Sequence, residues 1–291
     1  MRLACVILSA ALAWPSSAAE FCFDPAAAEA LGNQSKACDD TPRVKLPTPG
    51  VNLRVHVASA TRSPWIVNSG WRFLRNPGGK FRYKPPPGKA TLTIAEAFVY
   101  DGDAGFRLDP EDYDAAARLL KFLAAAPRRD LPPLADFAFV DDASGRAAEI
   151  VNLLVRRNLL FRLVTKPDPH FALNVVIGAP DFPRELASNP GSFATAVRGA
   201  LTDERRSMRI YGTEMAIVRA TSGGARARLQ ILNYSGRPIR GVRLRIRGVF
   251  RSIQLHVFGH PNAAPTDITT EAGFTEFTIP EAGVLAIADL E

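Results

Sequence analysis

Cysteine and histidine are scarce in this chain of 291 residues, which holds three cysteines and four histidines. The sequence also lacks a Gly-x-Ser-x-Gly elbow, a His-Glu-x-x-His pair, a phosphate-binding glycine loop and a Cys-x-x-Cys pair. These motifs mark serine nucleophiles, catalytic zinc, nucleotide phosphates and dithiol redox chemistry. No motif therefore names a reaction, and we expect no cofactor.

A metal site is not expected either. Two of the histidines, His256 and His260, bracket a turn-like stretch, and a four-residue spacing outside a helix does not direct two side chains at one metal. The cysteines make a poor zinc site without clustered histidines. We interpret His256 and His260 as part of a solvated turn.

Long apolar runs are missing except at the start of the chain. Arg2, the run LACVILSAALAW, and the small residues Ser17 and Ala19 are typical of a secretory signal peptide cut after Ala19. The run is too short to span a bilayer comfortably, and no lipobox precedes Cys5. We predict a periplasmic or secreted protein with no integral membrane segment once residues 1–19 are removed.

Two cysteines, Cys22 and Cys38, remain after such a cut, in a compartment where disulfides persist. Between them, Asp24 as N-cap, Pro25 at the first helical position and Gly32 past the end predict a short helix. Cysteine arithmetic favours a Cys22–Cys38 disulfide over free thiols or half of a metal site.

Composition describes a globular and basic chain. Hydrophobic residues make up 47% of the sequence, enough for a substantial core, and the formal net charge is +7. A basic balance permits attraction to anionic glycans, membranes or nucleic acid. Export disfavours nucleic acid, so we expect a glycan or cell-surface polymer as the partner, with a homo-oligomer as a further option.

Short apolar strands alternate with amphipathic helices from residue 90 to residue 212. The predicted strands are 90–100, 136–142, 159–165, 173–179 and 208–212. The predicted helices are 109–123, 144–158 and 190–201. The first helix has a strong start signal in Asp109, Pro110 and Glu111. This alternation predicts a mainly parallel sheet with helices on both faces.

After Gly212 the helical period disappears. Six short alternating segments follow, separated by turn sequences such as TSGG and SGRP, which predicts a small antiparallel β-sandwich. The predicted fold class is thus α/β followed by all-β. The expected divisions are a signal peptide (1–19), a disulfide-stapled segment with covering loops and one extra strand (20–89), an α/β domain (90–212) and the sandwich (213–291).

The run FVDDASGRAAEIVNLLVRRNLLFRLVTKPDPHFALNVVIGAPDF, residues 139–182, resembles part of a class I glutamine amidotransferase-like domain. Such a domain followed by a terminal β-sandwich is similar to the rear half of some bacterial β-galactosidases. In that family the α/β unit serves trimerisation, which the resemblance implies here. The nucleophilic Gly-x-Cys-x-Gly elbow and the glycosidase barrel are both absent from this sequence, so the resemblance implies a carbohydrate-enzyme module without either active site.

Two acids are weak candidates for catalysis. Asp141 stands at the carboxyl end of a predicted central strand, where open α/β sheets bind ligands, and the structural interpretation, which we favour, is helix capping together with Ser144. Glu96 lies in the apolar sequence TIAEAFVY, where a carboxylate needs a partner. A pair formed by Glu96 and Asp141 could perform acid–base work on a glycoside, whereas the structural alternative is a buried ion pair.

Aromatic and basic residues mix in the front segment. Trp65 and Trp71 stand near a group of aromatic rings and guanidiniums that could bind a sugar or an acidic glycan. The other members of that group are Arg72, Arg75, Phe81, Arg82 and Tyr83. The alternative is that the two tryptophans anchor long loops to the core.

The stretch GVRLRIRGVF places Arg243, Arg245 and Arg247 on one face of a predicted strand. No acid occurs between Glu214 and Asp267, so we expect these charges to meet water, the α/β domain or an anionic ligand. A solvated outer face is the structural interpretation, and an anionic glycan or cell-surface patch is the functional one.

Three hypotheses follow. The favoured one is an exported, non-catalytic protein, related to accessory domains of glycoside hydrolases, that binds a glycan or a protein partner. The alternatives are a small glycan hydrolase that uses an Asp/Glu pair, and a binder of anionic surfaces through the arginine-rich face.

Overall fold

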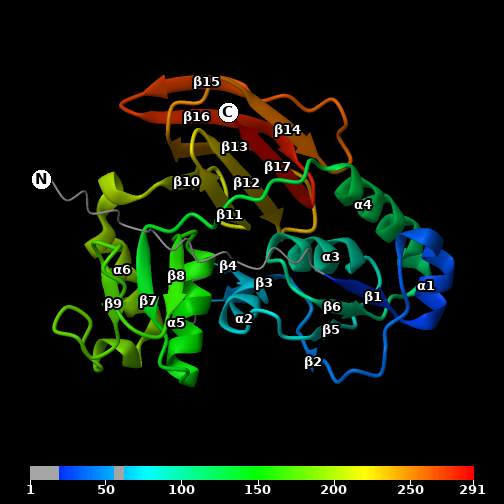
Figure 1. Cartoon of the computed structure of the whole chain (residues 1–291), viewed down its shortest axis with the longest axis horizontal. Helices are drawn as coiled ribbons and strands as arrows, with labels where there is room; N and C mark the ends of the chain where they lie inside the picture. The colour runs from blue at the N-terminus through cyan, green and yellow to red at the C-terminus, as the bar shows by residue number, and fades with distance from the viewer. Residues whose placement is uncertain (1–19, 56–61) are drawn as a thin grey trace, which may run out of the picture.

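The structure is a computed structural model that describes residues 20–55 and 62–291. The predicted signal peptide, residues 1–19, lies outside the described residues. Two parallel sheets with helices form one part of the molecule and two antiparallel sheets form another (Figure 1). The α/β and β-rich character predicted from the sequence is therefore present. Within the described ranges, no helix is long and apolar enough to cross a membrane.

The first parallel sheet has the strand order β1-β6-β5-β2, and all three pairings are parallel. Its strands are β1 (Phe21–Phe23), β2 (Val44–Lys45), β5 (Phe81–Tyr83) and β6 (Ala104–Phe106). The helices beside it are α1 (Pro25–Leu31), α3 (Ala90–Val99) and α4 (Tyr113–Ala125). Short 3-10 turns occupy Gly32–Gln34 and Pro110–Asp112. One face carries Phe23, Tyr83 and Phe106, which are almost fully buried and stack on one another. That face therefore belongs to the core.

Residues 90–100 were predicted as a strand, and this prediction is wrong. The segment Ala90–Val99 is helix α3, which packs between the first parallel sheet and the antiparallel strands (Figure 1). Eight of its ten residues are buried: Ala90, Leu92, Thr93, Ile94, Ala95, Glu96, Ala97 and Val99. A helix buried on nearly every side shows no amphipathic period, so its sequence is easily mistaken for a buried strand.

The second parallel sheet has the order β8-β7-β9. Its elements are β7 (Phe137–Val140), α5 (Gly145–Arg156), β8 (Phe161–Val164), β9 (Asn174–Val176) and α6 (Pro190–Arg205), with a 3-10 turn at Leu186–Ser188. The predicted alternation of strand and helix is present here. The narrower resemblance to an amidotransferase-like domain is not confirmed.

The C-terminal sheets have the orders β10-β13-β16-β15 and β11-β12-β17-β14, and every pairing is antiparallel. Their strands are β10 (Met208–Tyr211), β11 (Ala216–Gly223), β12 (Arg226–Asn233), β13 (Ile239–Arg247), β14 (Ile253–Val257), β15 (Thr266–Glu271), β16 (Phe274–Ala282) and β17 (Leu285–Leu290). The expectation that residues 208–212 join the parallel sheet is wrong, because β10 pairs with β13. Only one face of β10 is buried, as is usual in antiparallel sheets and unusual in parallel ones.

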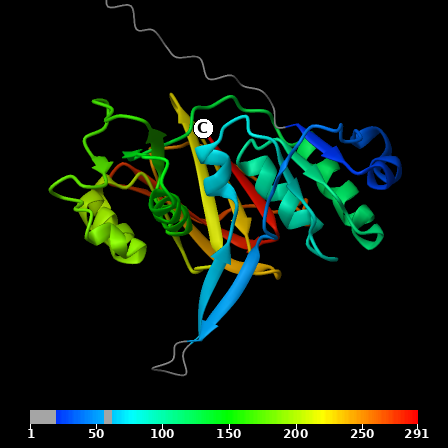
Figure 2. The ribbon, with the colours of Figure 1, turned by 90° about the horizontal axis from the view of Figure 1, so that it is seen from below.

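The front segment contributes more structure than the covering loops expected for it. Strands β1, β2 and β5 build the first parallel sheet, and helix α2 (Gly70–Arg75) packs on α5. Strands β3 (Gly50–Val55) and β4 (Arg62–Val67) form an antiparallel hairpin that projects from the body of the molecule (Figure 2). Strands of two or three residues are too short to show a period, which is why the sequence did not reveal them. The division of the chain into domains at residues 90 and 212 stays a prediction.

The Cys22–Cys38 disulfide is confirmed, with 4.8 Å between the two Cα atoms. It attaches residues 38–43, which we call the strap, to strand β1. The backbone N–H of Cys38 also donates to the carbonyl of Phe23, at 2.8 Å. This bond pairs the start of the strap with the edge of β1, and the side chains of Cys38 and Arg43 lie over Gly105 of β6, on the sheet face opposite the core.

We expect the double variant Cys22→Ser with Cys38→Ser to lower the free energy of unfolding by about 3 kcal/mol, the value for a loop of this size. Urea unfolding checks this, with the wild-type protein under a strong reductant as the matched sample. An unchanged free energy of unfolding in both samples would show that the strap is held by its other contacts.

Candidate functional site

A pocket of about 510 Å³ opens at the carboxyl edge of the first parallel sheet. Asp24 follows β1, Lys84 follows β5, Arg107 follows β6, and Lys45 ends β2, and all four line the pocket. The carboxyl ends of parallel strands meet at one edge of a sheet, where open α/β sheets bind their ligands. We call this site the carboxyl-edge pocket.

One wall of the pocket is the sheet face that points away from the core. Cys22, Gly105, Arg82 and Lys45 occupy one register row across the four strands. A side chain at Gly105 would place a Cβ atom 2.9 Å from the sulfur of Cys38. Glycine at this position therefore allows the strap to lie directly on the sheet.

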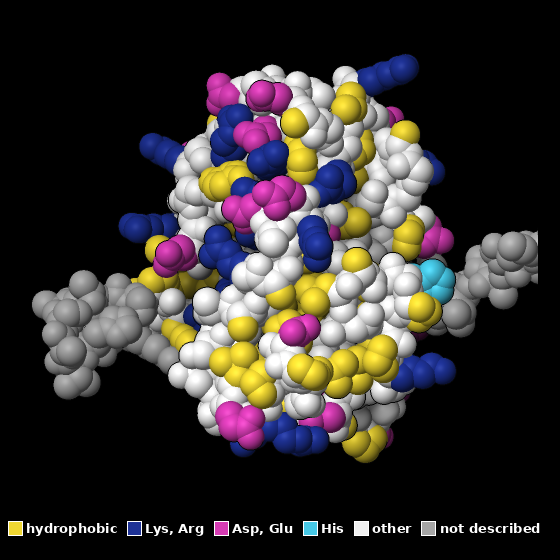
Figure 3. Space-filling model, turned by 90° about the vertical axis from the view of Figure 1, so that its left-hand side faces the viewer, with side chains coloured by type: hydrophobic (Ala, Val, Ile, Leu, Met, Phe, Trp, Pro, Cys, Tyr) yellow, Lys and Arg dark blue, Asp and Glu magenta, His cyan; other side chains and the backbone are white. Residues whose placement is uncertain are grey.

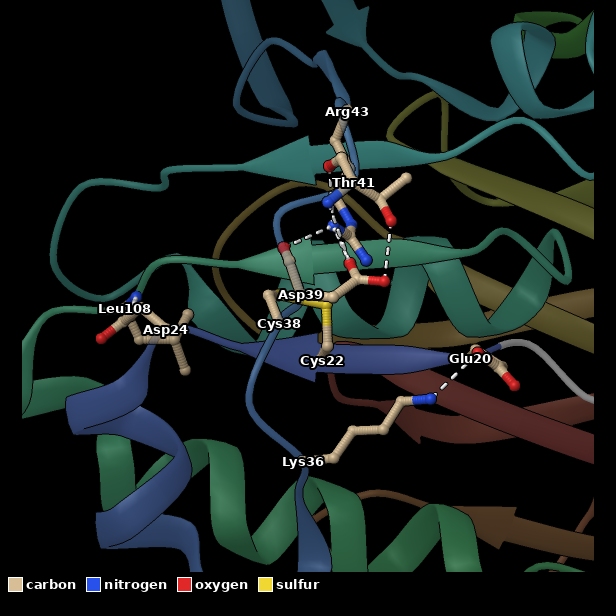
Figure 4. The surroundings of a disulfide bond; sticks show 9 residues. All are labelled: Glu20, Cys22, Asp24, Lys36, Cys38, Asp39, Thr41, Arg43 and Leu108. Carbon is tan, nitrogen blue, oxygen red and sulfur yellow. Dashed lines mark hydrogen bonds and ion pairs between the residues drawn. A yellow bond between two sulfur atoms is a disulfide. The ribbon is translucent and has the colours of Figure 1, made fainter.

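The strap forms the other wall and is held by its own polar contacts (Figure 4). Asp39 accepts a hydrogen bond from the Thr41 hydroxyl at 2.7 Å and forms an ion pair with Arg43 at 2.8 Å. The Thr41 hydroxyl and the Arg43 guanidinium lower the pKa of Asp39 to about 2. Asp39 is therefore ionised at neutral pH and engaged within the strap.

Charge is unevenly balanced in the pocket. Its cationic side chains are Arg43, Lys45, Arg82, Lys84 and Arg107, and its carboxylates are Asp24, Asp39 and Asp40. Asp24 caps α1 through the N–H of Ala27 and also accepts from the N–H of Leu108. Asp39 pairs with one of these cations, Arg43, and the lining as a whole holds two more cations than carboxylates.

Glu96 lies away from the carboxyl-edge pocket and has no exposed surface. Its carboxylate accepts hydrogen bonds from the backbone N–H of Ser69 at 2.9 Å, the Tyr83 hydroxyl at 2.6 Å and the Tyr234 hydroxyl at 2.8 Å. Burial raises the pKa of Glu96 to about 7, and the three hydrogen bonds limit the rise. The side chain joins α3 to α2, to the first parallel sheet and to the β12–β13 turn.

Asp141 follows the central strand β7, as expected, but its carboxylate is bound by Arg75. Arg75 donates to both carboxylate oxygens, at 2.7 and 2.9 Å, and both side chains are 17% exposed. Asp141 also accepts from the backbone N–H of Ala143 at 3.0 Å. The cap of α5 is Ser144, whose hydroxyl accepts from the N–H of Ala147.

The structure does not bring Glu96 and Asp141 together as a pair. Glu96 binds Ser69 at the start of α2, and Asp141 binds Arg75 at its end. The six residues of α2 extend about 9 Å along the helix axis. The two carboxylates thus hold opposite ends of one short helix.

Arg243, Arg245 and Arg247 contact an acidic and an aromatic side chain that the sequence analysis did not identify as their partners. Arg243 and Arg245 form ion pairs with Glu276 at 2.8 and 3.5 Å. The guanidiniums of Arg245 and Arg247 lie 3.9 and 4.7 Å from the ring centroid of Phe274. Both partners come from β16, the strand beside β13, which lies beyond the acid-free stretch of sequence. On the face that Figure 3 shows, acidic and basic side chains are interspersed over the upper part of the molecule.

The aromatic and basic residues of the front segment are distributed over several places. The Arg156 guanidinium lies 3.4 Å from the ring centroid of Trp65, and Arg72 lies 4.1 Å from that of Trp71. Both tryptophans are half-buried against the core of the second parallel sheet. Of the remaining group, Phe81 and Tyr83 are buried, Arg75 binds Asp141, and Arg82 lines the carboxyl-edge pocket.

The two histidines approach different carboxylates. His256 lies 3.8 Å from Asp289, and His260 lies 3.3 Å from Glu281. In the described part of the chain, no group of three or more metal-ligating side chains is placed to hold an ion.

Sequence reasoning missed most of the carboxyl-edge pocket. Lys45, Lys84 and Arg107 come from strands of two or three residues or follow them directly, and such strands were not recognised. The one available signal was a basic residue beside a short aromatic sequence, as in FRYK and FR.

No family model and no curated protein matches this chain. Among solved structures, the chain is similar to α-L-fucosidase isoenzyme 2 from Paenibacillus thiaminolyticus, with a TM-score of 0.52 and 11% identity over 86% of this chain. The match covers 65% of that enzyme's chain. A likeness at this identity concerns the fold alone, which is thus similar to part of the fold of that fucosidase.

Weaker matches include a GH30 endoxylanase from Clostridium papyrosolvens C71, with a TM-score of 0.22, 14% identity, and coverage of 76% of this chain and 60% of that one. Another is an α-amylase from H. orenii, with a TM-score of 0.19, 11% identity, and coverage of 76% and 56%. Scores this low carry no argument.

Stability should depend on pH through Glu96. Its pKa in the folded protein, about 7, lies above the 4.5 of an exposed glutamate, so the folded state binds the proton more tightly. The contribution of Glu96 to stability is complete below pH 4.5 and is lost as the pH rises through 7. The shift corresponds to about 3 kcal/mol.

Urea unfolding of the wild type and of Glu96→Gln across this pH range isolates the effect, because glutamine does not titrate. We expect the variant to gain about 3 kcal/mol relative to the wild type between pH 4 and pH 8. A difference that stays constant with pH would contradict the assignment.

Proposed function

We propose that this protein is an exported glycan-binding protein without catalytic activity, and that its ligand binds in the carboxyl-edge pocket. The position of the pocket carries the proposal. It lies over the outward face of the four-stranded parallel sheet and reaches the carboxyl ends of its strands, where α/β sheets present their ligand sites. Its lining comes from strands β2, β5 and β6, from the residues that follow β1, and from the strap.

The state of the two candidate catalytic acids supports a binding function. A glycosidase needs two carboxyl groups that flank the bond to be cleaved. Glu96 has no exposed surface, and Asp141 is held by Arg75. A substrate would meet no surface of Glu96, and it would have to displace Arg75 to engage Asp141.

Because the fold is similar to that of a fucosidase, carbohydrate is the first ligand class to test. A fold by itself does not assign a function, so the likeness to a fucosidase serves as a guide to the choice of ligand. The Cys22–Cys38 disulfide supports an oxidising compartment, in agreement with the predicted signal peptide. A protein partner and a homo-oligomer stay predictions.

A glycan hydrolase is the second candidate, because the pKa of Glu96, about 7, lies in the range suited to a general acid. The burial of its carboxyl group speaks against that function. Anionic-surface binding through Arg243, Arg245 and Arg247 is the third candidate, and it competes with Glu276 and Phe274 for the same guanidiniums.

We expect no turnover of a panel of aryl glycosides that includes an α-L-fucoside, and no dependence of any trace activity on Asp141→Asn or Glu96→Gln. A fluorogenic assay with each purified variant measures this. Catalysis by the wild type that both substitutions abolish, in variants that circular dichroism shows to be folded, would replace the binding proposal with the hydrolase.

A further inference from the structure

We infer that the carboxyl-edge pocket binds an anionic sugar, which presents a carboxylate or a sulfate ester to the row of basic side chains. The inference rests on the proposed function and specifies the chemistry of its ligand. The supporting observation is the cluster of basic side chains on the outward face of the first parallel sheet.

Three neighbouring strands present their cations on the same face. Arg82 and Lys84 are two residues apart in sequence along and beyond β5, so their side chains share the face opposite the buried Tyr83. Arg107 stands two residues after Gly105 and shares that face by the same rule. Exposure agrees, because Arg82, Lys84 and Arg107 are exposed whereas the intervening residues are buried.

Like charges are placed directly beside each other. Lys45 and Arg82 are register partners on β2 and β5, which separates their backbones by about 5 Å. Like charges opposite one another on adjacent strands destabilise a sheet. A bound anion removes this repulsion, so the free protein and its ligand are electrostatically complementary.

The pocket's own acids do not neutralise these cations. Among the described residues, no carboxylate forms an ion pair with Lys45, Arg82, Lys84 or Arg107. Three carboxylates face five cations in the lining, a difference of two positive charges. Asp39 pairs with Arg43, one of the five cations, Asp24 accepts hydrogen bonds from backbone N–H groups, and Asp40 is exposed on the strap.

A neutral sugar would find little to hold it here. Proteins bind the faces of neutral sugars chiefly through exposed aromatic rings, and the two aromatic residues in the lining are Tyr83 and Phe106. Each is only 1% exposed, and both pack into the core on the other side of the sheet. Recognition must therefore come from charge and hydrogen bonds, for which the planar guanidiniums of Arg82 and Arg107 suit carboxylate and sulfate groups.

The test is isothermal titration of the whole protein with matched ligands. These are an oligogalacturonate, the same oligomer as its methyl ester, a chondroitin sulfate oligosaccharide and a neutral cello-oligosaccharide, with inorganic sulfate and free galacturonate as small anions. We expect binding of one or both acidic oligosaccharides, weakened by added salt, and none of the methyl ester or the neutral oligomer.

The variants Arg82→Gln and Arg107→Gln should each weaken that binding at least about tenfold, the loss of one charge-assisted bidentate contact. Arg118→Gln and Lys121→Gln, exposed positions on α4 outside the pocket, are the matched controls and should bind as the wild type does. Circular dichroism and thermal unfolding establish that each variant is folded.

The other outcomes separate the two proposals. Equal binding of the acid and its methyl ester, reduced by the pocket variants, would retain glycan binding and overturn the anionic ligand. Binding of sulfate and galacturonate without any oligosaccharide would retain an anion site and overturn glycan binding. Acidic-glycan binding that survives both pocket variants, or no binding of any ligand, would overturn the inference.

Discussion

The buried carboxylate of Glu96 is the interaction on which the arrangement of this molecule depends. A carboxylate without access to water is costly unless donors surround it, and here the donors come from three separate parts of the chain. Ser69 begins α2, Tyr83 belongs to the first parallel sheet, and Tyr234 follows β12. The hydrogen bonds to this one side chain therefore connect α3 to the first parallel sheet, to helix α2 and to the antiparallel strands.

This architecture explains why the acids that looked most suitable for chemistry are not available for it. Glu96 is enclosed by its donors, and Asp141 holds the far end of α2 through Arg75. Both carboxylates bind residues of α2 or its cap and so have a structural role. The open surface lies instead at the carboxyl edge of the first sheet, where the disulfide holds the strap and basic side chains are in excess.

Strong local signals in the sequence predicted much of the fold. Capping residues and one-sided apolar periods identified α1, α4, α5 and α6, and cysteine arithmetic identified the disulfide. Alternation identified six of the C-terminal antiparallel strands and missed β15. Helix α3 was misread because its burial removes the period. The carboxyl-edge pocket was missed because a four-stranded sheet built from strands of two or three residues arises only from long-range pairing. Glu276 was likewise invisible as the partner of Arg243 until β13 and β16 were paired.

The most direct test of anionic-glycan binding in the carboxyl-edge pocket is a map of amide chemical-shift changes as an acidic oligosaccharide is titrated into the isotope-labelled protein. We expect the changes to cluster on Lys45, Lys84, Gly105 and Arg107, with little effect on β13. Changes that cluster on the outer face of β13 and β16 instead, or around α2, would contradict it.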